Sequence, residues 1–374
     1  MSATTARERS ALLAPPLAAE IPEAAQGAPE ASAYRVRGYE PRDEAQVVAL
    51  LARTLPRWAR CRDPVAVWRW KHGANPFGAS RTLVALLGER VVGSSSRMLW
   101  RLARGERSYT ALRSVDLASE PALQRTGIAS ALAVVGWSEV QRSGLPLGFY
   151  TPNDNSAKLA GRDGRRFAGV LRPELLVRRP LPALRAWWRA RGGAGGSRGA
   201  EARGAFRKAP LAVEDLLRDR RAAVEDLLAA DRARDRGRFR TEHSWESLCW
   251  RYARHPELRY WAVATERRGA LEGLLVFRAE DHHSARRVVL EDLLLRERQP
   301  RALRSLGSEL GAVVSADLVQ HAFPESISIG LLGAGLRLHS RGYRLVTRVL
   351  DPELGDIPAR LESWQLTLGD LREI

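Results

Sequence analysis

The sequence predicts an α/β protein that contains two copies of one domain, and two observations support this prediction. Segments with alternating apolar residues, typical of strands, take turns with segments that carry apolar residues at helical spacing. The chain also starts again after its midpoint. VWRWKHGANPFGASRTLVALLGERVVGS from Val67 and CWRYARHPELRYWAVATERRGALEGLLVF from Cys249 both run from Trp-Arg-aromatic through a proline into two apolar strands. Matching Trp68 with Trp250 gives an offset of 182 residues, which is too long for a solenoid unit and implies two domains.

Length and composition are consistent with this division. The chain has 374 residues, of which 45% are hydrophobic, so it can bury two cores. Residues 1–33 are rich in Ala, Pro and Glu and are expected to form a disordered leader. The two copies are expected at 34–179 and 209–374, separated by a basic linker rich in Gly and Arg at 180–208.

The order of elements in the first copy follows from its apolar periodicity. YRVRGY alternates as a strand does, whereas Val47 and Leu51 mark a helical face in RDEAQVVALLARTL, and Ile128, Leu132 and Val135 mark another. The expected elements are a strand at 34–39, a helix at 42–55, a hairpin at 81–99 that turns at Gly88-Glu89, a strand at 109–117, a helix at 126–144, a strand at 145–151, a short helix at 155–164 and extended chain at 166–178.

The charge and the cysteines exclude several classes of function. The net charge of +17 comes almost entirely from arginine, which is interleaved with 43 acidic residues, and no nucleic-acid module is recognisable. Nucleic acid is therefore an unlikely partner, although a positive surface favours anionic ligands such as a nucleotide phosphate. Cys61 and Cys249 lack metal-ligand spacing, so we expect no metal and two buried thiols. The absence of a signal-like start and of a long apolar run predicts a cytoplasmic protein.

The segment Leu181–Arg191 is basic and carries Trp187 and Trp188. Such a segment fits a helix that lies on a membrane surface. It also fits a connector that packs one of the tryptophans onto a domain. We expect the connector.

LQRTGIASAL, from Leu123 to Leu132, lies between a predicted strand and a predicted helix. The first N–H groups of a helix lack intrahelical partners and carry partial positive charge. Gly127 has no Cβ and Ala129 the smallest one, so a phosphate could approach these amides closely. The guanidinium of Arg125 could reach the same phosphate. The stretch is either a phosphate cradle or an ordinary helix start.

The order strand, helix, hairpin and strand, followed by Gln124-Arg125-Thr126-Gly127-Ile128-Ala129, resembles the GCN5-related N-acetyltransferases, whose signature is Gln/Arg-x-x-Gly-x-Gly/Ala. PNDNS at 152–156 and WQLTLGD at 364–370 also look like this family. The resemblance covers nearly everything from Tyr34 to the end, as in tandem members. It implies two tandem domains, each a mixed, mostly antiparallel twisted sheet flanked by helices.

The resemblance also implies a reaction. Acetyl coenzyme A, or another acyl coenzyme A, would donate its acyl group to a primary amine that attacks the thioester directly, without a metal. The acceptor would be a small molecule or a peptide. The alternative is a non-catalytic protein of the same fold that binds acyl coenzyme A or serves as a scaffold. The oligomeric state is left open.

The resemblance implies a set of cofactor-binding residues before, within and after the loop. They are Ser114, Val115, Leu117 and Ala118 on the strand; Gln124, Arg125, Thr126, Gly127, Ile128 and Ala129 in the loop; and Asn153 and Asn155 after the next strand. Asn155 fits the N-cap of the following helix equally well, and that role needs no cofactor.

Three residues are candidates for the chemistry. Asp116 or Glu120 would accept the proton of the amine. Asp116 could instead form an ion pair with an arginine, and Glu120 could be a solvated turn residue. Family members usually carry a tyrosine as general acid where this chain has Ala157, Lys158 and Ala160. Tyr150 could replace it; a thiol of pKa about 8.5 could leave without an acid; or catalysis has been lost.

The second copy has LRERQPRALRSLGSEL, without a glycine loop and with Pro300 near the turn, so one cofactor site per chain is expected, in the N-terminal copy. The acceptor amine is not identified. A group of aromatic and polar residues could line its cleft or could belong to the core. These residues are Trp68, Trp70, Lys71, His72 and Asn75.

Overall fold

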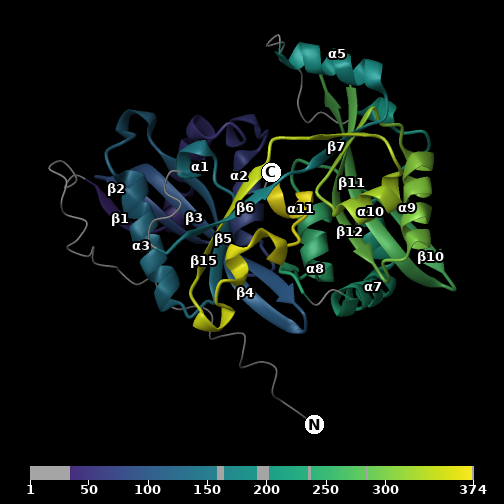
Figure 1. Ribbon diagram of the computed structural model, residues 1–374. Coiled ribbons are helices and arrows are strands. Elements are labelled where there is room, and N and C mark those ends of the chain that lie inside the picture. The colour runs from purple at the N-terminus through teal and green to yellow at the C-terminus, as the bar shows by residue number, and fades with distance from the viewer. Residues whose placement is uncertain (1–33, 158–163, 192–201, 235–236, 284, 373–374) are drawn as a thin grey trace. The chain divides into compact units, whose positions relative to one another are not determined.

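The computed structural model describes residues 34–157, 164–191, 202–234, 237–283 and 285–372 (Figure 1). They form two compact units. The first comprises 34–65, 80–97 and 114–143, and the second comprises 66–79, 98–113 and the described part of 144–374. Both units combine strands and helices, which confirms the predicted fold class. The predicted leader and residues 192–201 of the predicted linker lie outside the described residues.

The first unit contains the N-terminal strands and the helix that follows the loop. Its elements are β1 (Arg35–Gly38), a 3-10 turn (Pro41–Asp43), α1 (Glu44–Thr54), a 3-10 turn (Trp58–Arg60), β2 (Arg81–Leu87), the first part of β3 (Arg90–Arg104), the last part of β4 (Arg107–Ser119), a 3-10 turn (Pro121–Leu123) and α3 (Ile128–Arg142). β2 pairs antiparallel with both β1 and β3, with Ala85 opposite Val36 and Gly93. Each strand and α-helix among these elements lies within a few residues of its predicted range.

The helix α3 packs unusually close to the sheet at Gly93. A Cβ on Gly93 would lie 2.6 Å from Cγ2 of Ile128, the first residue of α3, and 3.1 Å from Cδ1 of Leu132. Such a separation is closer than carbon atoms tolerate. The missing side chain of Gly93 therefore lets the N-terminal turn of α3 sit directly on β3.

The second unit contains the remaining parts of the long strands β3 and β4 and the strands that pair next to them. Its first group of elements is the end of α2 (Pro64–Trp68), a π-helix (Arg69–Gly73), the rest of β3 and β4, β5 (Leu147–Tyr150), α4 (Asp154–Ala157), β6 (Arg166–Leu171), β9 (Arg240–Thr241) and β15 (Tyr343–Val349). β4 pairs parallel with β5, with Arg113 opposite Phe149, and β15 lies antiparallel between β5 and β6.

A further sheet of the second unit has the strand order β14-β7-β13-β12-β11-β10-β8, with β12 and β13 parallel. Its strands are β7 (Glu174–Val177), β8 (Leu211–Ala212), β10 (Trp261–Arg267), β11 (Ala270–His282), β12 (Ala285–Leu295), β13 (Leu318–His321) and β14 (Leu336–His339). The accompanying helices are α5 (Pro180–Arg191), α6 (Val213–Asp219), α7 (Arg221–Arg234), α8 (Trp245–Leu248), a π-helix (Cys249–Ala253), α9 (Pro300–Val313), α10 (Glu325–Leu332) and α11 (Leu368–Leu371), with short 3-10 turns at Arg203–Ala205, Pro352–Leu354, Ile357–Ala359 and Leu361–Ser363.

Helices cover both faces of this sheet (Figure 1). Leu306 of α9 and Leu331 of α10 pack with Phe277, whereas Leu227 of α7 packs with Val276. Neighbouring residues of one strand thus serve opposite cores, as the alternation of side chains in a strand requires.

Two strands pair with strands from the other side of the predicted linker at 180–208. β7 precedes the predicted linker but lies between β13 and β14, and β15 follows the linker but lies between β5 and β6. Both ends of the predicted linker are ordered, since α5 begins it and the buried Ala202 and Ala205 end it. The domain limits at 179 and 209 stay a prediction.

The offset of 182 residues between the two aromatic segments is wrong by two. Trp70 and Trp250 both occupy the second position of a π-helix, and the strands β2 and β10 begin at Arg81 and Trp261. Both pairs are 180 residues apart. Trp68 therefore corresponds to Leu248 rather than to Trp250.

The segment at the start of the predicted linker is the helix α5. Its buried side chain is Ala186, which packs with Ala285 and Leu318, whereas Trp187 and Trp188 remain exposed. The buried side chain that packs this segment is thus an alanine, whereas the sequence favoured a tryptophan. Within the described residues, no helix is long and apolar enough to cross a membrane.

Two glycines of α9 give a matched test of the packing of this unit. A Cβ on Gly307 would lie 1.8 Å from the carbonyl oxygen of Leu331, whereas a Cβ on Gly311 would meet nothing within 4 Å. Gly307→Ala should lower the free energy of unfolding by about 2 kcal/mol or more, because α10 must move away. Gly311→Ala should raise it by up to about 1 kcal/mol through helix propensity. Denaturant melts of both variants test this; equal effects would contradict the packing.

Candidate functional site

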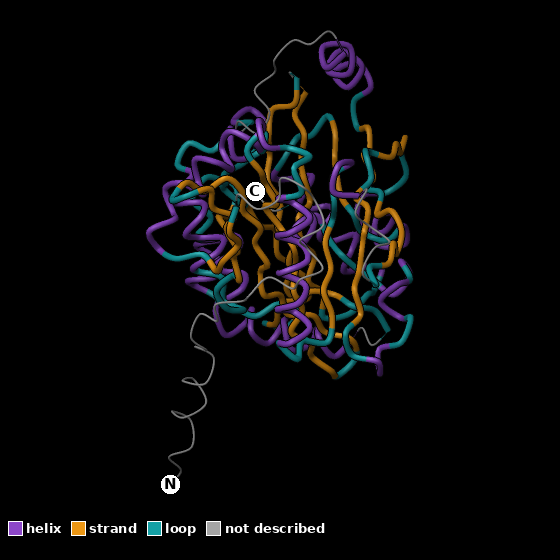
Figure 2. The backbone as a smooth tube through the Cα atoms, turned by 90° about the vertical axis from the view of Figure 1, so that its left-hand side faces the viewer, coloured by secondary structure: helices purple, strands orange, loops and turns teal. Residues whose placement is uncertain are grey.

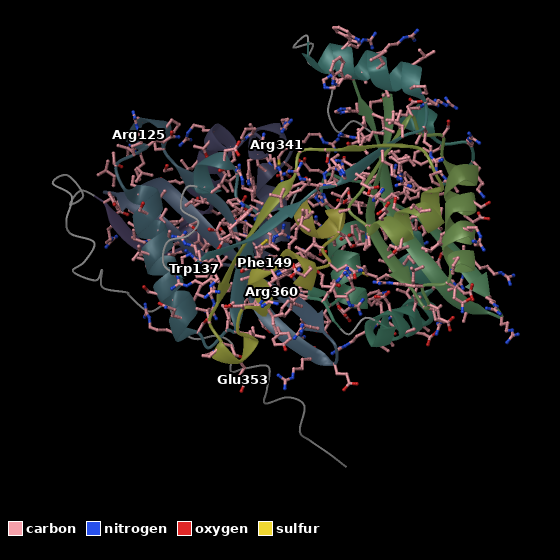
Figure 3. The ribbon with its side chains drawn as sticks, viewed as in Figure 1. Arg125, Trp137, Phe149, Arg341, Glu353 and Arg360 are labelled. Carbon is pink, nitrogen blue, oxygen red and sulfur yellow. The ribbon has the colours of Figure 1, made fainter. Side chains whose placement is uncertain are left out.

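The loop between β4 and α3 combines two left-handed residues. Arg125 has φ +70° and Gly127, the N-cap of α3, has φ +92°. The hydroxyl of Thr126 donates to the carbonyl oxygen of Leu123 at 2.7 Å and closes the turn. The four loop residues 124–127 are exposed, and Figure 3 shows the Arg125 side chain at the surface. The backbone thus turns sharply before α3 begins.

The loop is suited to an anion. The first amides of α3 have no intrahelical acceptors, and the helix dipole adds partial positive charge. The first turn of α3 carries no acidic residue. A Cβ on Gly127 would lie 3.5 Å from the hydroxyl oxygen of Tyr34, its nearest neighbour. A ligand phosphate could therefore reach these amides.

The strand before the loop carries the first catalytic candidate. Asp116 has φ +51°, which interrupts regular strand geometry within β4. Its Oδ1 accepts a hydrogen bond of 2.8 Å from the indole N–H of the buried Trp58. A donor to a carboxylate favours its ionised form. The carboxylate is half-buried, and the bond from Trp58 orients it.

The other residues of this strand alternate in burial. Val115 and Ala118 are buried, whereas Ser114 and Leu117 are half-buried, and Leu117 packs against the core beneath α3. Ile128 is buried in the same core, and Ala129 is half-buried beside it. The apolar members of the predicted set therefore hold the loop in place.

Glu120, at the end of the strand, is not a solvated turn residue. Its carboxylate lies 3.1 Å from Nη2 of Arg53, and its side chain is only 18% exposed. Its backbone N–H donates to the carbonyl oxygen of Val92 at 2.8 Å. The carboxylate is therefore paired with a cation, which disfavours it as a base.

Three predicted site residues belong to the second unit. Tyr150, on β5, is buried; burial raises the pKa of its hydroxyl, and the charge of Arg165 partly opposes this shift. Oδ1 of Asn153 accepts from the backbone N–H of Ser156 at 2.9 Å, so Asn153 caps α4. Asn155 lies inside α4, and the prediction that it is the cap is wrong.

The structure therefore divides the predicted set. The first unit brings together the strand and loop residues, which are Ser114, Val115, Asp116, Leu117, Ala118, Glu120, Gln124, Arg125, Thr126, Gly127, Ile128 and Ala129. The second unit contains Tyr150, Asn153 and Asn155.

The second copy has a counterpart of Asp116 on its strand but no counterpart of the glycine loop at 124–127. The backbone N–H of Arg296 donates to the carbonyl oxygen of Glu272 at 2.8 Å, and the backbone N–H of Glu120 donates in the same way to the carbonyl oxygen of Val92. Asp292 and Asp116 each precede the donor by four residues, so they occupy corresponding strand positions. Asp292 accepts hydrogen bonds from Tyr252 and Thr367, and burial raises the pKa of its carboxyl to about 6.

The turn into α9 differs from the turn into α3. None of residues 296–300 has a positive φ, and α9 begins with Pro300, which has no N–H. This turn therefore offers fewer amides to an anion.

The aromatic residues considered for the acceptor cleft are core residues. Trp68, Trp70, Lys71, His72 and Asn75 are all at most 6% exposed. Trp70 stacks on Trp250 at 5.0 Å, and each indole N–H donates to the other's backbone oxygen, at 2.7 and 2.9 Å. These contacts hold the two π-helices together.

His255 completes this aromatic core. Its ring lies 4.3 Å from Trp70, and its Nδ1 accepts from the backbone N–H groups of Glu257 and Leu258 at 3.1 and 3.0 Å. An accepting Nδ1 carries no proton, so the ring is neutral. Burial, with the nearby charges of Arg251 and Arg278, lowers the pKa of His255 to about 2.

The described residues contain no group of three or more His, Cys, Asp and Glu side chains able to hold a metal ion. Cys249 is buried as predicted, but Cys61 is only partly buried.

Sequence reasoning missed Trp58 and Tyr34 as parts of this site. Trp58 reaches Asp116 across 58 residues of chain, and Tyr34 precedes Gly127 by even more. No local pattern marks either contact, since each joins two segments that lie far apart in the sequence.

Comparison with solved structures identifies the fold. A GCN5-related N-acetyltransferase from Anabaena variabilis ATCC 29413 matches with a TM-score of 0.59 and 11% identity over 85% of this chain and 73% of that one. A protein of unknown function from Enterococcus faecalis V583, described as a probable N-acyltransferase, matches with 0.58 and 11% over the same shares. A GCN5-related N-acetyltransferase from Kribbella flavida matches with 0.52 and 17% over 87% and 73%.

These matches show that the chain has the fold of the GCN5-related N-acetyltransferases, which confirms the predicted resemblance at the level of fold. No protein-family model matches the chain, and no curated protein matches it in sequence.

The neutral His255 predicts an acid-sensitive stability. The unfolded chain takes up a proton below pH 6.5, whereas folded His255 stays neutral until about pH 2. The free energy of unfolding is therefore unaffected by this group above pH 6.5 and falls as the pH drops below it, by about 2–3 kcal/mol at pH 4.5.

Asn75 occupies the equivalent position in the first copy, where its Oδ1 accepts from the N–H of Phe77 at 3.1 Å. His255→Asn supplies a similar acceptor that does not titrate, so denaturant melts between pH 7 and 4.5 should show a flatter pH dependence. An unchanged slope would contradict the assignment.

Proposed function

We propose that the chain is an N-acetyltransferase with two tandem domains that uses an acyl coenzyme A to acylate a primary amine. The observation that carries the proposal is the exposed left-handed turn at Arg125 and Gly127, which opens a 15-residue helix directly after an interrupted strand. The shared fold supports the same reaction class. The proposed cofactor site lies in the N-terminal copy alone.

The residues of the loop would bind the pyrophosphate of coenzyme A. The amides of Gly127, Ile128 and Ala129 would donate to its oxygens, and the exposed guanidinium of Arg125 would add a charged contact. Ser114, Val115, Leu117 and Ala118 would contact the pantetheine arm through the backbone of β4. Coenzyme A supplies the acyl group as an activated thioester. Asn153 would contribute only indirectly, because its side chain already caps α4.

Asp116 is the proposed general base. An amine attacks only when neutral, so its proton must leave before or during attack. The Trp58 indole donates to one carboxylate oxygen and thereby orients the group as a proton acceptor. Glu120 is a second choice, because it is paired with Arg53.

A general acid for the leaving thiolate is less well supported. Tyr150 is buried, and burial raises its pKa, which suits a proton donor. A thiolate can also leave unassisted, given a thiol pKa of about 8.5. The acceptor remains a small-molecule or peptide amine.

A non-catalytic protein that binds acyl coenzyme A is the second candidate. The missing tyrosine at 157–160 favours it. Incubation with acetyl coenzyme A and a panel of amines, with release of free thiol as the readout, separates the two: binding without thiol release would support the second. A nucleic-acid partner is less favoured, because part of the positive charge is buried, at Arg97, Arg113, Arg165, Arg251, Arg278 and Arg348.

Gly127→Glu should abolish coenzyme A binding, because a carboxylate would cover the amides and repel the pyrophosphate. Gly144 is a matched control: it lies just past the other end of α3, has φ +67°, and a Cβ there would meet nothing within 4 Å. Gly144→Glu carries similar backbone strain and should bind normally. Calorimetric titration of both variants tests the loop, and an unchanged affinity in Gly127→Glu would remove it from the site.

Asp116→Asn should lower kcat by about 10²–10⁴-fold with little change in coenzyme A affinity, as expected for loss of a general base. The asparagine oxygen can still accept from Trp58, so folding should be preserved. Trp58→Phe removes the donor but keeps the carboxylate and should cost less activity. Steady-state kinetics paired with thermal melts decide: a stable Asp116→Asn enzyme with normal turnover would exclude Asp116.

A further inference from the structure

The helix α5 turns its large apolar side chains to the solvent and its small ones to the protein. Its buried residue is Ala186, with Ala183 partly buried in the same cluster. Its large apolar residues face outward: Leu181 is 68% exposed, Leu184 53% and Trp188 63%. Their spacing of i, i+3 and i+7 puts these three side chains on one helix face. A surface helix of a soluble domain normally buries such a face.

Basic residues flank the exposed apolar face. Arg185 and Arg189 are both exposed, and the twelve residues of α5 include no acidic side chain. The two tryptophans pack edge to face at 5.3 Å, and Trp187 is also exposed. Figures 1 and 2 show α5 beyond the ends of the neighbouring strands.

The base of the helix is held firmly. The backbone N–H groups of Arg178 and Arg179 both donate to the carbonyl oxygen of Asp317, at 2.9 and 3.2 Å. Ala186 packs against β12 and β13 through Ala285 and Leu318. The outward face is thus presented by a fixed helix.

We propose that α5 is an interfacial helix that binds the surface of an anionic phospholipid bilayer. Tryptophan rings favour the headgroup region, apolar side chains such as leucine enter the acyl boundary, and arginines pair with anionic lipids. The interleaved arginines and the net charge of +17 disfavour a second copy of this chain, since like charges would meet. An acidic protein would satisfy the charge, but it would also need its own matching apolar groove.

The test is co-sedimentation of the full chain with vesicles of phosphatidylglycerol or of phosphatidylcholine at physiological salt. We expect binding to the anionic vesicles only. Because a chain of high positive charge can bind such vesicles by charge alone, the charge-neutral Trp188→Ser is the decisive variant. It should weaken vesicle partitioning about tenfold, as expected for withdrawal of one large apolar group. Arg185→Glu should weaken it by a similar factor or more.

Phe167→Ser is the matched control, because Phe167 is 54% exposed and lies on β6 rather than on α5. It should bind as the parent chain does. Absence of binding to anionic vesicles, or parental binding by Trp188→Ser, would overturn the proposal. A change of oligomeric state in Trp188→Ser, measured by analytical ultracentrifugation, would also overturn the proposal, because it would make this face a contact between copies of the chain. The same holds if Trp188→Ser loses binding to an acidic protein but keeps its binding to vesicles.

Discussion

The contact between Gly93 and Ile128 constrains the whole candidate site. Because residue 93 has no side chain, the first turn of α3 rests directly on β3. The chain must then leave β4 and enter α3 within a few residues, and the left-handed conformations of Arg125 and Gly127 make that turn possible. The amides at the start of α3 are exposed as a consequence of this geometry. Anion binding would thus follow from how the helix packs.

The same strand position has opposite surroundings in the two copies. Asp116 is half-buried and accepts a hydrogen bond from the indole N–H of Trp58, beside a loop that could receive a phosphate. Asp292 is fully enclosed by Tyr252 and Thr367, next to a helix that begins with proline. Residues near the C-terminus thus occupy the space around Asp292. The second copy has kept the strand geometry and uses the carboxylate to hold its own chain.

Local patterns were enough to predict the elements and the loop. Periodicity placed α1 and α3 within two residues of their ends, and the Gln-Arg-Thr-Gly-Ile-Ala pattern marked the loop before α3, because these features depend on neighbours in the sequence. Long-range features could not be predicted. The exchange of β7 and β15, the Trp58–Asp116 bond and the outward face of α5 all depend on pairing between distant segments. The sequence offered Asn155 as a cap, whereas Asn153, two residues earlier, caps α4.

The most direct test of the account is the stoichiometry of coenzyme A binding, measured by calorimetric titration of the full chain. The account assigns a site to the loop at Gly127 and none to the turn at Pro300. It therefore predicts one equivalent of coenzyme A per chain. Two equivalents would show that the second copy binds as well, and no binding would show that the left-handed loop is an ordinary helix start.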